Sequence, residues 1–224
     1  MRGFLDRSPL LFRAQAALRG HRRLAVSSSS DIVIEGFPRS GNTYAVAAFR
    51  HAQGREMRIA RHLHAPAQVF LALRYGVPAL VVVRRLPDPV LSMVIREPAL
   101  SLAQVLKAYA RFHEDLLPVR EAIVLADFDE VISDFGGVIH RVNERYGTTF
   151  REYRHTDANE AAVRGIVEEM DREDTGTTQV NERSVARPSA TRDALKAALL
   201  EQYEAPSLAP LRARAEIARR ELFA

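Results

Sequence analysis

The stretch 31–49 most constrains what this chain can fold into. It opens with a short β-branched run, 32–34, which predicts a buried strand. A loop bounded by Gly36 and Gly41 follows, and the sequence then predicts a helix over 43–51. A strand, a glycine loop and a helix in this order aim main-chain N–H groups and the positive end of the helix at an anion. The stretch therefore predicts a phosphate-binding turn.

The loop departs from the ATP-type phosphate loop at one position. That motif reads G-x-x-x-x-G-K-[ST], whereas here Gly41 is followed by Asn42 and Thr43. The lysine that reaches the outer phosphates of ATP is missing, and a cation, Arg39, stands three residues earlier. Taken alone, the turn is equally consistent with an ordinary connection in which Ser40 or Thr43 caps the helix.

Three further apolar runs predict buried strands, and helical patterns separate them. The predicted strands are 57–61, 79–84 and 122–126, and the predicted helices are 66–75, 88–96, 102–116, 135–146, 158–170, 190–203 and one from about 208. This alternation predicts an α/β fold with a doubly wound, mainly parallel sheet flanked by helices and a helical C-terminal part. Such sheets bind ligands beyond the carboxyl ends of their strands.

Four candidate groups each follow a predicted strand directly. They are the glycine loop, the pair His62 and His64, Arg84, and Phe128. Because the carboxyl ends of parallel strands share one edge, we expect all four to meet there. In an extended stretch, residues 62 and 64 point to the same side, so both histidines could face the site.

A second motif begins at Arg84. Ser92 follows eight residues later, in the first turn of a helix that Asp88 is expected to cap. A guanidinium group makes forked, charge-assisted contacts to phosphate, and a serine hydroxyl adds a neutral donor. In isolation, a surface arginine and an ordinary helix-start serine explain the pattern better.

The two motifs together resemble the sulfotransferases that use 3′-phosphoadenosine 5′-phosphosulfate (PAPS). The loop of that family, Pro-[Lys/Arg]-Ser-Gly-Thr-Thr, reads here from Pro38 to Thr43, with Tyr44 following. The second motif of the family is an arginine and a serine separated by seven residues, as in Arg84 and Ser92. The resemblance covers roughly 31–147. It implies a fold similar to the phosphate-loop nucleoside triphosphatases and transfer of a sulfuryl group from PAPS to an acceptor hydroxyl, with 3′,5′-adenosine bisphosphate as the product.

The resemblance also implies binding roles for individual residues. The 5′-phosphosulfate would be held by Pro38, Arg39, Ser40, Gly41, Asn42 and Thr43, with Tyr44 beside them. Arg84 and Ser92 would bind the 3′-phosphate, and Phe128 would lie near the adenine, although a plain core position explains Phe128 nearly as well. The late Arg-Lys-Gly-x-x-Gly motif of the family is missing; Arg187, with Arg183 and Arg192, stands about where it would fall.

A histidine base is the remaining part of the resemblance. His64 matches the His-x-Pro context of the family, and His62 better matches its distance to Arg84. We expect His64 to remove the acceptor proton, with His62 as second candidate, and Arg39 to neutralise the leaving bisphosphate. No metal is expected, because the chain has no cysteine and no clear third ligand beside the two histidines.

The positive charge of the chain is concentrated at its start. The net charge is +4, and residues 1–30 alone carry six arginines and one acid. A nucleic-acid binder more often spreads positive charge over its folded face, so no nucleic-acid partner is expected. The segment 1–23 is predicted to be a solvated amphipathic helix. The alternative is an arm that docks on an anionic partner, a membrane surface included.

We expect a basic segment, 1–30, and a single domain, 31–224. Within that domain, 31–147 is the nucleotide-binding core, and 148–224 is mostly helical with a polar loop near 171–190. No signal peptide or membrane-spanning run is recognised, and a cytoplasmic location is expected. The acceptor could be a small molecule, a glycan or a lipid. The competing hypotheses are a phosphate-loop kinase or triphosphatase without the usual lysine, and a non-catalytic anion-binding protein.

Overall fold

The computed structural model of the chain describes residues 23–175 and 190–224. Its sheet has four parallel strands in the order β2-β1-β3-β4. The strands are β1 (Ile32–Gly36), β2 (Ile59–Arg61), β3 (Ala79–Val83) and β4 (Val124–Asp127). Each strand matches a predicted apolar run to within about two residues at either end, so the predicted parallel α/β sheet flanked by helices is confirmed.

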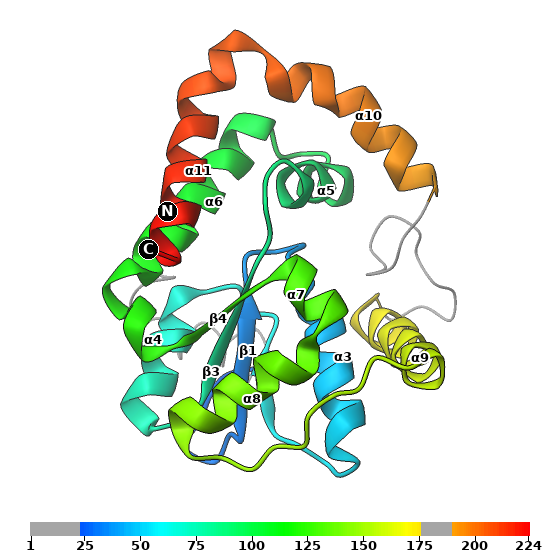
Figure 1. The fold of residues 1–224 in the computed structure, drawn as a ribbon. Helices are drawn as coiled ribbons and strands as arrows, with labels where there is room; N and C mark the ends of the chain where they lie inside the picture. Colours follow the sequence, from blue (N-terminus) through cyan, green and yellow to red (C-terminus); the bar gives the residue numbers. More distant parts are fainter. Residues whose placement is uncertain (1–22, 176–189) are drawn as a thin grey trace.

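Helices separate the strands and cover the sheet (Figure 1). They are α3 (Asn42–Gln53), α4 (Pro66–Tyr75), α5 (Asp88–Arg96), α6 (Leu102–Leu116), α7 (Phe128–Ser133), α8 (Phe135–Tyr146), α9 (Asp157–Thr175), α10 (Ala190–Glu204) and α11 (Ala209–Leu222), with 3-10 turns η1 (Leu117–Ala122) and η2 (Pro206–Leu208). The short helix α7 was not predicted. It begins directly after β4 because the Asp127 carboxylate accepts the N–H of Asp129.

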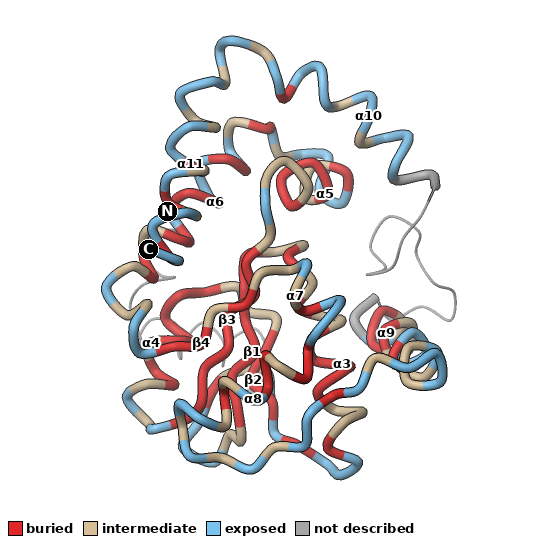
Figure 2. Tube along the Cα trace, viewed as in Figure 1, coloured by how far each residue is buried: buried red, intermediate tan, exposed pale blue. Residues whose placement is uncertain are grey.

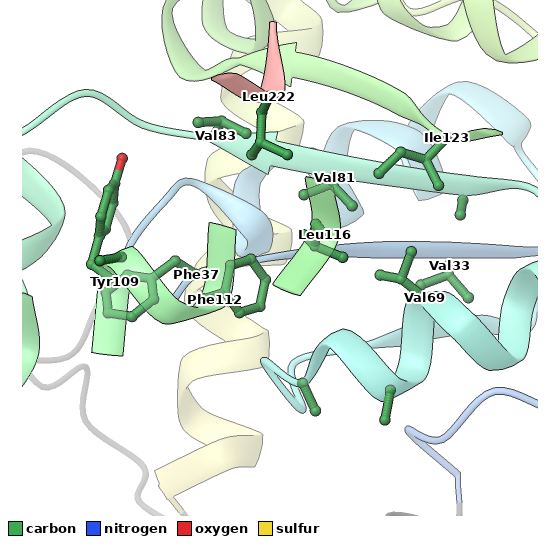
Figure 3. Packing of buried hydrophobic residues seen from close by; sticks show 14 of the residues in the cluster. Val33, Phe37, Val69, Val81, Val83, Tyr109, Phe112, Leu116, Ile123 and Leu222 are labelled. Atoms are coloured by element: carbon green, nitrogen blue, oxygen red, sulfur yellow. The ribbon is translucent and has the colours of Figure 1, made fainter. Parts of the chain in front are cut away.

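Alternate side chains of the central strands enter two separate cores. On β1, Ile32 and Ile34 pack with residues of α3, α8 and α9, whereas Val33 packs with residues of α4, α6 and α11. Figure 3 shows this second core, in which Val33 and Val81 lie among side chains of the covering helices. Because helices cover both faces, β1 and β3 are buried along their whole length (Figure 2).

The last two helices form the predicted helical C-terminal part. Helix α11 lies along α6, and α10 arches towards α5 (Figure 1). Arg214 on α11 pairs with Glu114 on α6 at 2.7 Å. Of the predicted polar loop, 171–175 form the end of α9 and Ala190 begins α10, and 176–189 lie outside the described residues, as does the predicted N-terminal helix up to residue 22. None of the described helices combines the length and apolar character needed to cross a bilayer.

One core residue, His113 on α6, is a fully buried histidine beside Phe37 and Phe112. Its Nδ1–H donates to the Tyr109 carbonyl at 2.8 Å, and its Nε2 has no partner in the described part of the chain. Burial lowers the pKa of His113 from an ordinary 6.5 to about 4; the hydrogen bond to Tyr109 opposes this shift and the charge of Arg219 adds to it.

This buried histidine predicts a loss of stability in acid. The unfolded chain takes up the proton near pH 6.5 and the folded chain only near pH 4. The free energy of unfolding is therefore highest above pH 6.5 and falls as the pH drops towards 4. The loss from this group amounts to about 3 kcal/mol. The free energy of unfolding, measured with urea across this pH range, should depend less on pH in His113→Leu than in the wild type. His140 is an exposed histidine. If His140→Leu flattened the pH dependence of stability as much as His113→Leu does, the assignment to His113 would be contradicted.

Candidate functional site

The segments that follow the four strands meet at the carboxyl edge of the sheet, as the parallel pairing requires. Direct contacts join them. The Arg84 guanidinium lies 4.0 Å from the centre of the Phe128 ring and donates to the Arg39 carbonyl at 3.3 Å. His64 Nδ1 lies 2.8 Å from the Gly36 carbonyl, and His62 Nε2 lies 3.4 Å from the Thr43 hydroxyl. The fold therefore brings together the glycine loop, both histidines, Arg84 and Phe128.

Both glycines of the loop lie where a side chain does not fit. A Cβ on Gly36 would lie 2.3 Å from the Val82 carbonyl on β3, and a Cβ on Gly41 would lie 2.6 Å from the Phe128 ring. Gly41 also has a φ of 97°, in the left-handed region that favours glycine. The loop backbone thus passes close over β3 and Phe128, and glycine is needed at both ends.

Asn42, which stands where an ATP-type loop has lysine, holds the loop closed. Its Nδ2 donates to the carbonyls of Gly36 and Phe37, at 3.3 and 3.0 Å. No side chain caps the N-terminus of α3, and the buried Ser40 hydroxyl has no partner among the described residues. Uncapped N–H groups and a spare hydroxyl are donors that an anion-binding loop supplies. The half-buried Pro38 completes the turn.

The two predicted phosphate-binding motifs are in contact with each other. Arg39 Nε donates to the Ser92 hydroxyl on α5 at 2.8 Å, while the Arg39 carbonyl accepts from Arg84. Arg39 itself has a φ of 70°, which turns its backbone out of the strand direction. Two arginines from motifs far apart in sequence therefore lie on the same side of the sheet edge, a strongly favourable place for an anion.

Asp88 connects Arg84 to the C-terminal helix α10. Its carboxylate accepts from Arg84 and from Lys196 on α10, at 2.7 and 2.8 Å. Burial opposes ionisation of this carboxyl, but Lys196 and Arg84 outweigh it and hold the pKa of Asp88 below its usual value. The prediction that Asp88 caps α5 was wrong, because its side chain makes ion pairs instead of a capping hydrogen bond.

The two histidines were expected to lie in an extended stretch, but the structure places them in a tight turn. The φ angles of His62 and His64 are 60° and 50°, in the left-handed region, where each non-glycine residue costs roughly 1–2 kcal/mol. Their rings nevertheless stack, with centres 6.1 Å apart. The buried Glu35 carboxylate on β1 holds this turn by accepting the N–H groups of Leu63 and His64, at 2.9 and 3.2 Å.

His62 has both ring nitrogens engaged. The Arg61 guanidinium can only donate, so Nδ1 of His62, 2.8 Å from Arg61 Nη1, must accept. Its proton is then on Nε2, next to the Thr43 hydroxyl. Burial, followed by the charges of Arg61, His64, Arg50 and Arg96, lowers the pKa of His62 well below its ordinary value. This ring is therefore neutral near pH 7, with its lone pair occupied.

His64 has the opposite arrangement. A carbonyl can only accept, so Nδ1 of His64 must donate to Gly36, which leaves a lone pair on Nε2. The side chain is 29% exposed, and no partner of Nε2 lies among the described residues. Glu35 Oε2 is 3.6 Å from the donating Nδ1. A partly exposed histidine with an unoccupied lone pair on Nε2 and a carboxylate beside Nδ1 has the arrangement of a general base.

Tyr44 connects the loop helix to α9. Its hydroxyl donates to Glu160 at 2.8 Å, and Glu160 also accepts from Tyr153 and lies 3.0 Å from His155 Nδ1. Burial, then the contact with Glu160, raises the pKa of Tyr44. The structure therefore gives Tyr44 a bridging role between α3 and α9.

Sequence reasoning missed three polar residues near the site, Glu35, Gln68 and Lys196. Glu35 left a signal, a charge directly after the apolar strand run 32–34, whereas Lys196 is placed by the tertiary fold alone. Arg183 and Arg187 lie outside the described residues, and the side chain of Arg192 is not described either. Within the described ranges, no three His, Cys, Asp or Glu side chains gather as metal ligands would.

Comparison of the chain with family models, with curated proteins and with solved structures found no match. What this edge of the sheet can do is therefore inferred from its own chemistry.

Proposed function

We propose that this protein is a PAPS-dependent sulfotransferase with a fold of the phosphate-loop type. The observation that carries the proposal is the contact of Arg39 with both members of the second motif, through its side chain to Ser92 and its carbonyl to Arg84. Two cationic motifs thus converge on one place. A nucleotide with anionic groups at two ends, one at the glycine loop and one at Arg84, suits that arrangement.

The donors present fit such a ligand. The N–H groups at the start of α3 and the Ser40 hydroxyl supply neutral donors, and Arg39 and Arg84 supply charge. Bound PAPS would contribute an activated sulfuryl group, whose transfer should resemble phosphoryl transfer in being an in-line displacement. Arg84 and Ser92 would hold the 3′-phosphate, and Phe128 would support Arg84 from its ring face.

The chain's own residues then move one proton and stabilise one charge. His64 Nε2 takes the proton of the acceptor hydroxyl as its oxygen bonds to sulfur. The bridging S–O bond breaks, and the electron pair leaves with the bisphosphate, where Arg39 and the loop N–H groups offset the negative charge. His62 is the weaker candidate for the base, because its lone pair on Nδ1 already accepts a hydrogen bond from Arg61.

Nucleotide preference tests this function. The temperature of thermal unfolding should rise when 3′,5′-adenosine bisphosphate is added. At 100 times its dissociation constant, the ligand should stabilise the protein by about 2.7 kcal/mol. ATP with magnesium should give a smaller shift. A shift with ATP and magnesium but none with the bisphosphate would instead favour a kinase or triphosphatase.

Arg84 and its neighbour Arg85 form a matched pair for this test. Arg84→Ala should weaken binding of the bisphosphate by about 10- to 100-fold, because one charged hydrogen-bonding group is worth about 1.5–3 kcal/mol. Arg85 is two-thirds exposed and pairs with Asp127, so Arg85→Ala should bind as the wild type does. Calorimetric titration of both variants with 3′,5′-adenosine bisphosphate measures the two dissociation constants. Equal losses would indicate a diffuse charge effect and not a phosphate site.

A further inference from the structure

Glu35 is a charged residue inside a buried strand. It is fully buried near the end of β1, which is covered along its whole length (Figure 2). A buried carboxylate is stable only when donors surround it. Its oxygens lie within hydrogen-bonding distance of four N–H donors, those of Gly36 (3.4 Å), Leu63 (2.9 Å), His64 (3.2 Å) and the Gln68 side chain (2.7 Å).

The orientation of Gln68 shows that these donors face an acceptor. Its Oε1 accepts the N–H of Val26 at 3.0 Å, so its Nε2 must be the atom directed at Glu35 Oε1. A protonated Glu35 would place an O–H among these N–H groups, whereas an ionised carboxylate satisfies them all. The surroundings of Glu35 are therefore built for a negative charge.

That charge lies directly behind His64. Glu35 Oε2 is 3.6 Å from His64 Nδ1, on the same nitrogen that donates to the Gly36 carbonyl. The other charged groups acting on the stacked His62 are Arg61 on β2, Arg50 on α3 and Arg96 on α5, all cationic. Glu35 supplies a negative charge 3.6 Å from the nitrogen that would share the charge of a protonated His64.

We propose that Glu35 is a positioning residue that acts through His64. It fixes the turn so that the imidazole keeps its proton on Nδ1, and it stabilises the imidazolium that forms when Nε2 takes a proton from the acceptor. The inference rests on the proposed function and deepens it by giving the base a carboxylate partner.

Ionisation of the two groups is coupled. Burial raises the pKa of Glu35, whereas the charge of His64 and the hydrogen bonds of Leu63, Gln68 and Gly36 oppose that rise. Protonation of His64 therefore favours the ionised form of Glu35, and the ionised form favours protonation of His64 in return.

Nitrogen NMR of the histidine rings tests this without any need for turnover. In the ¹⁵N-labelled wild type near neutral pH, the proton should be on Nδ1 of His64 and on Nε2 of His62. In Glu35→Gln, a smaller fraction of the His64 rings should carry the proton on Nδ1, because the carboxylate 3.6 Å from that nitrogen is gone. Glu144→Gln, which alters an exposed Glu–His pair with His140, should leave the proton of His64 on Nδ1 as in the wild type.

Two outcomes would overturn the inference. One is a wild-type His64 with its proton on Nε2, a result that stands even if Glu35→Gln does not fold. The other is a His64 tautomer ratio that is the same in Glu35→Gln and Glu144→Gln. Failure of the proposed function would look different: 3′,5′-adenosine bisphosphate would not bind the wild type, while the ring measurements would still report on the pair.

Discussion

Replacing His64 by asparagine is expected to lower the rate of sulfuryl transfer by about 10²- to 10⁴-fold, the usual contribution of a general base. The substitution removes Nε2, a nitrogen beside the glycine loop that has no partner among the described residues and can accept a proton. Because His64 is not among the residues expected to hold phosphate, the dissociation constant of 3′,5′-adenosine bisphosphate should stay within about threefold. The measurement is release of that product from PAPS with a panel of hydroxyl acceptors.

His62→Asn is the matched comparison for this prediction. It alters a neighbouring ring in the same turn, whose lone pair is already occupied by Arg61. The His62 variant should therefore lose less activity than the His64 variant. If the His62 variant loses more while still binding the bisphosphate, the roles of the two histidines are reversed.

The second large effect is expected from Gly36→Ala. A methyl group there would meet the Val82 carbonyl at 2.3 Å and Asn42 Oδ1 at 2.5 Å, where β1 pairs with β3. The backbone of β3 cannot yield without loss of sheet hydrogen bonds, so destabilisation of about 3 kcal/mol is expected. Binding of the bisphosphate should weaken as well, because Asn42 closes the loop through the carbonyl of Gly36.

Gly165→Ala is the control for that prediction. Gly165 is exposed on α9, and nothing lies within 4 Å of the position that its Cβ would take. Alanine there should stabilise the chain by about 0.5–1 kcal/mol, because glycine is unfavourable inside a helix. Urea unfolding of both variants compares them directly. A Gly36→Ala protein as stable as the wild type would contradict the close approach of β1 and β3.

The strands and most helices could be predicted because their signals are local. The apolar run 79–84 becomes β3 almost residue for residue, and the proline and glycine around 66–76 fix both ends of α4. Parallel pairing then follows from the alternation of elements, and with it the meeting of Arg39, Arg84 and Phe128 at one edge.

The parts that could not be predicted depend on contacts between distant residues. The turn at His62 and His64 departs from an extended chain because Glu35, 28 residues before Leu63, accepts its N–H groups. Asp88 would cap α5 on local rules, but Lys196, 108 residues away, and Arg84 take its carboxylate. Local propensity carries no information about such partners, although a glutamate directly after an apolar strand run is a signal worth reading.

The most direct test of the account is a crystal structure with 3′,5′-adenosine bisphosphate. We expect one nucleotide to lie with its 5′-phosphate on the loop 37–43 and its 3′-phosphate against Arg84 and Ser92, with His64 Nε2 facing the 5′ end. A bisphosphate bound elsewhere, or one that contacts Arg39 or Arg84 but cannot reach both motifs, would contradict the single-nucleotide site on which the proposed function depends.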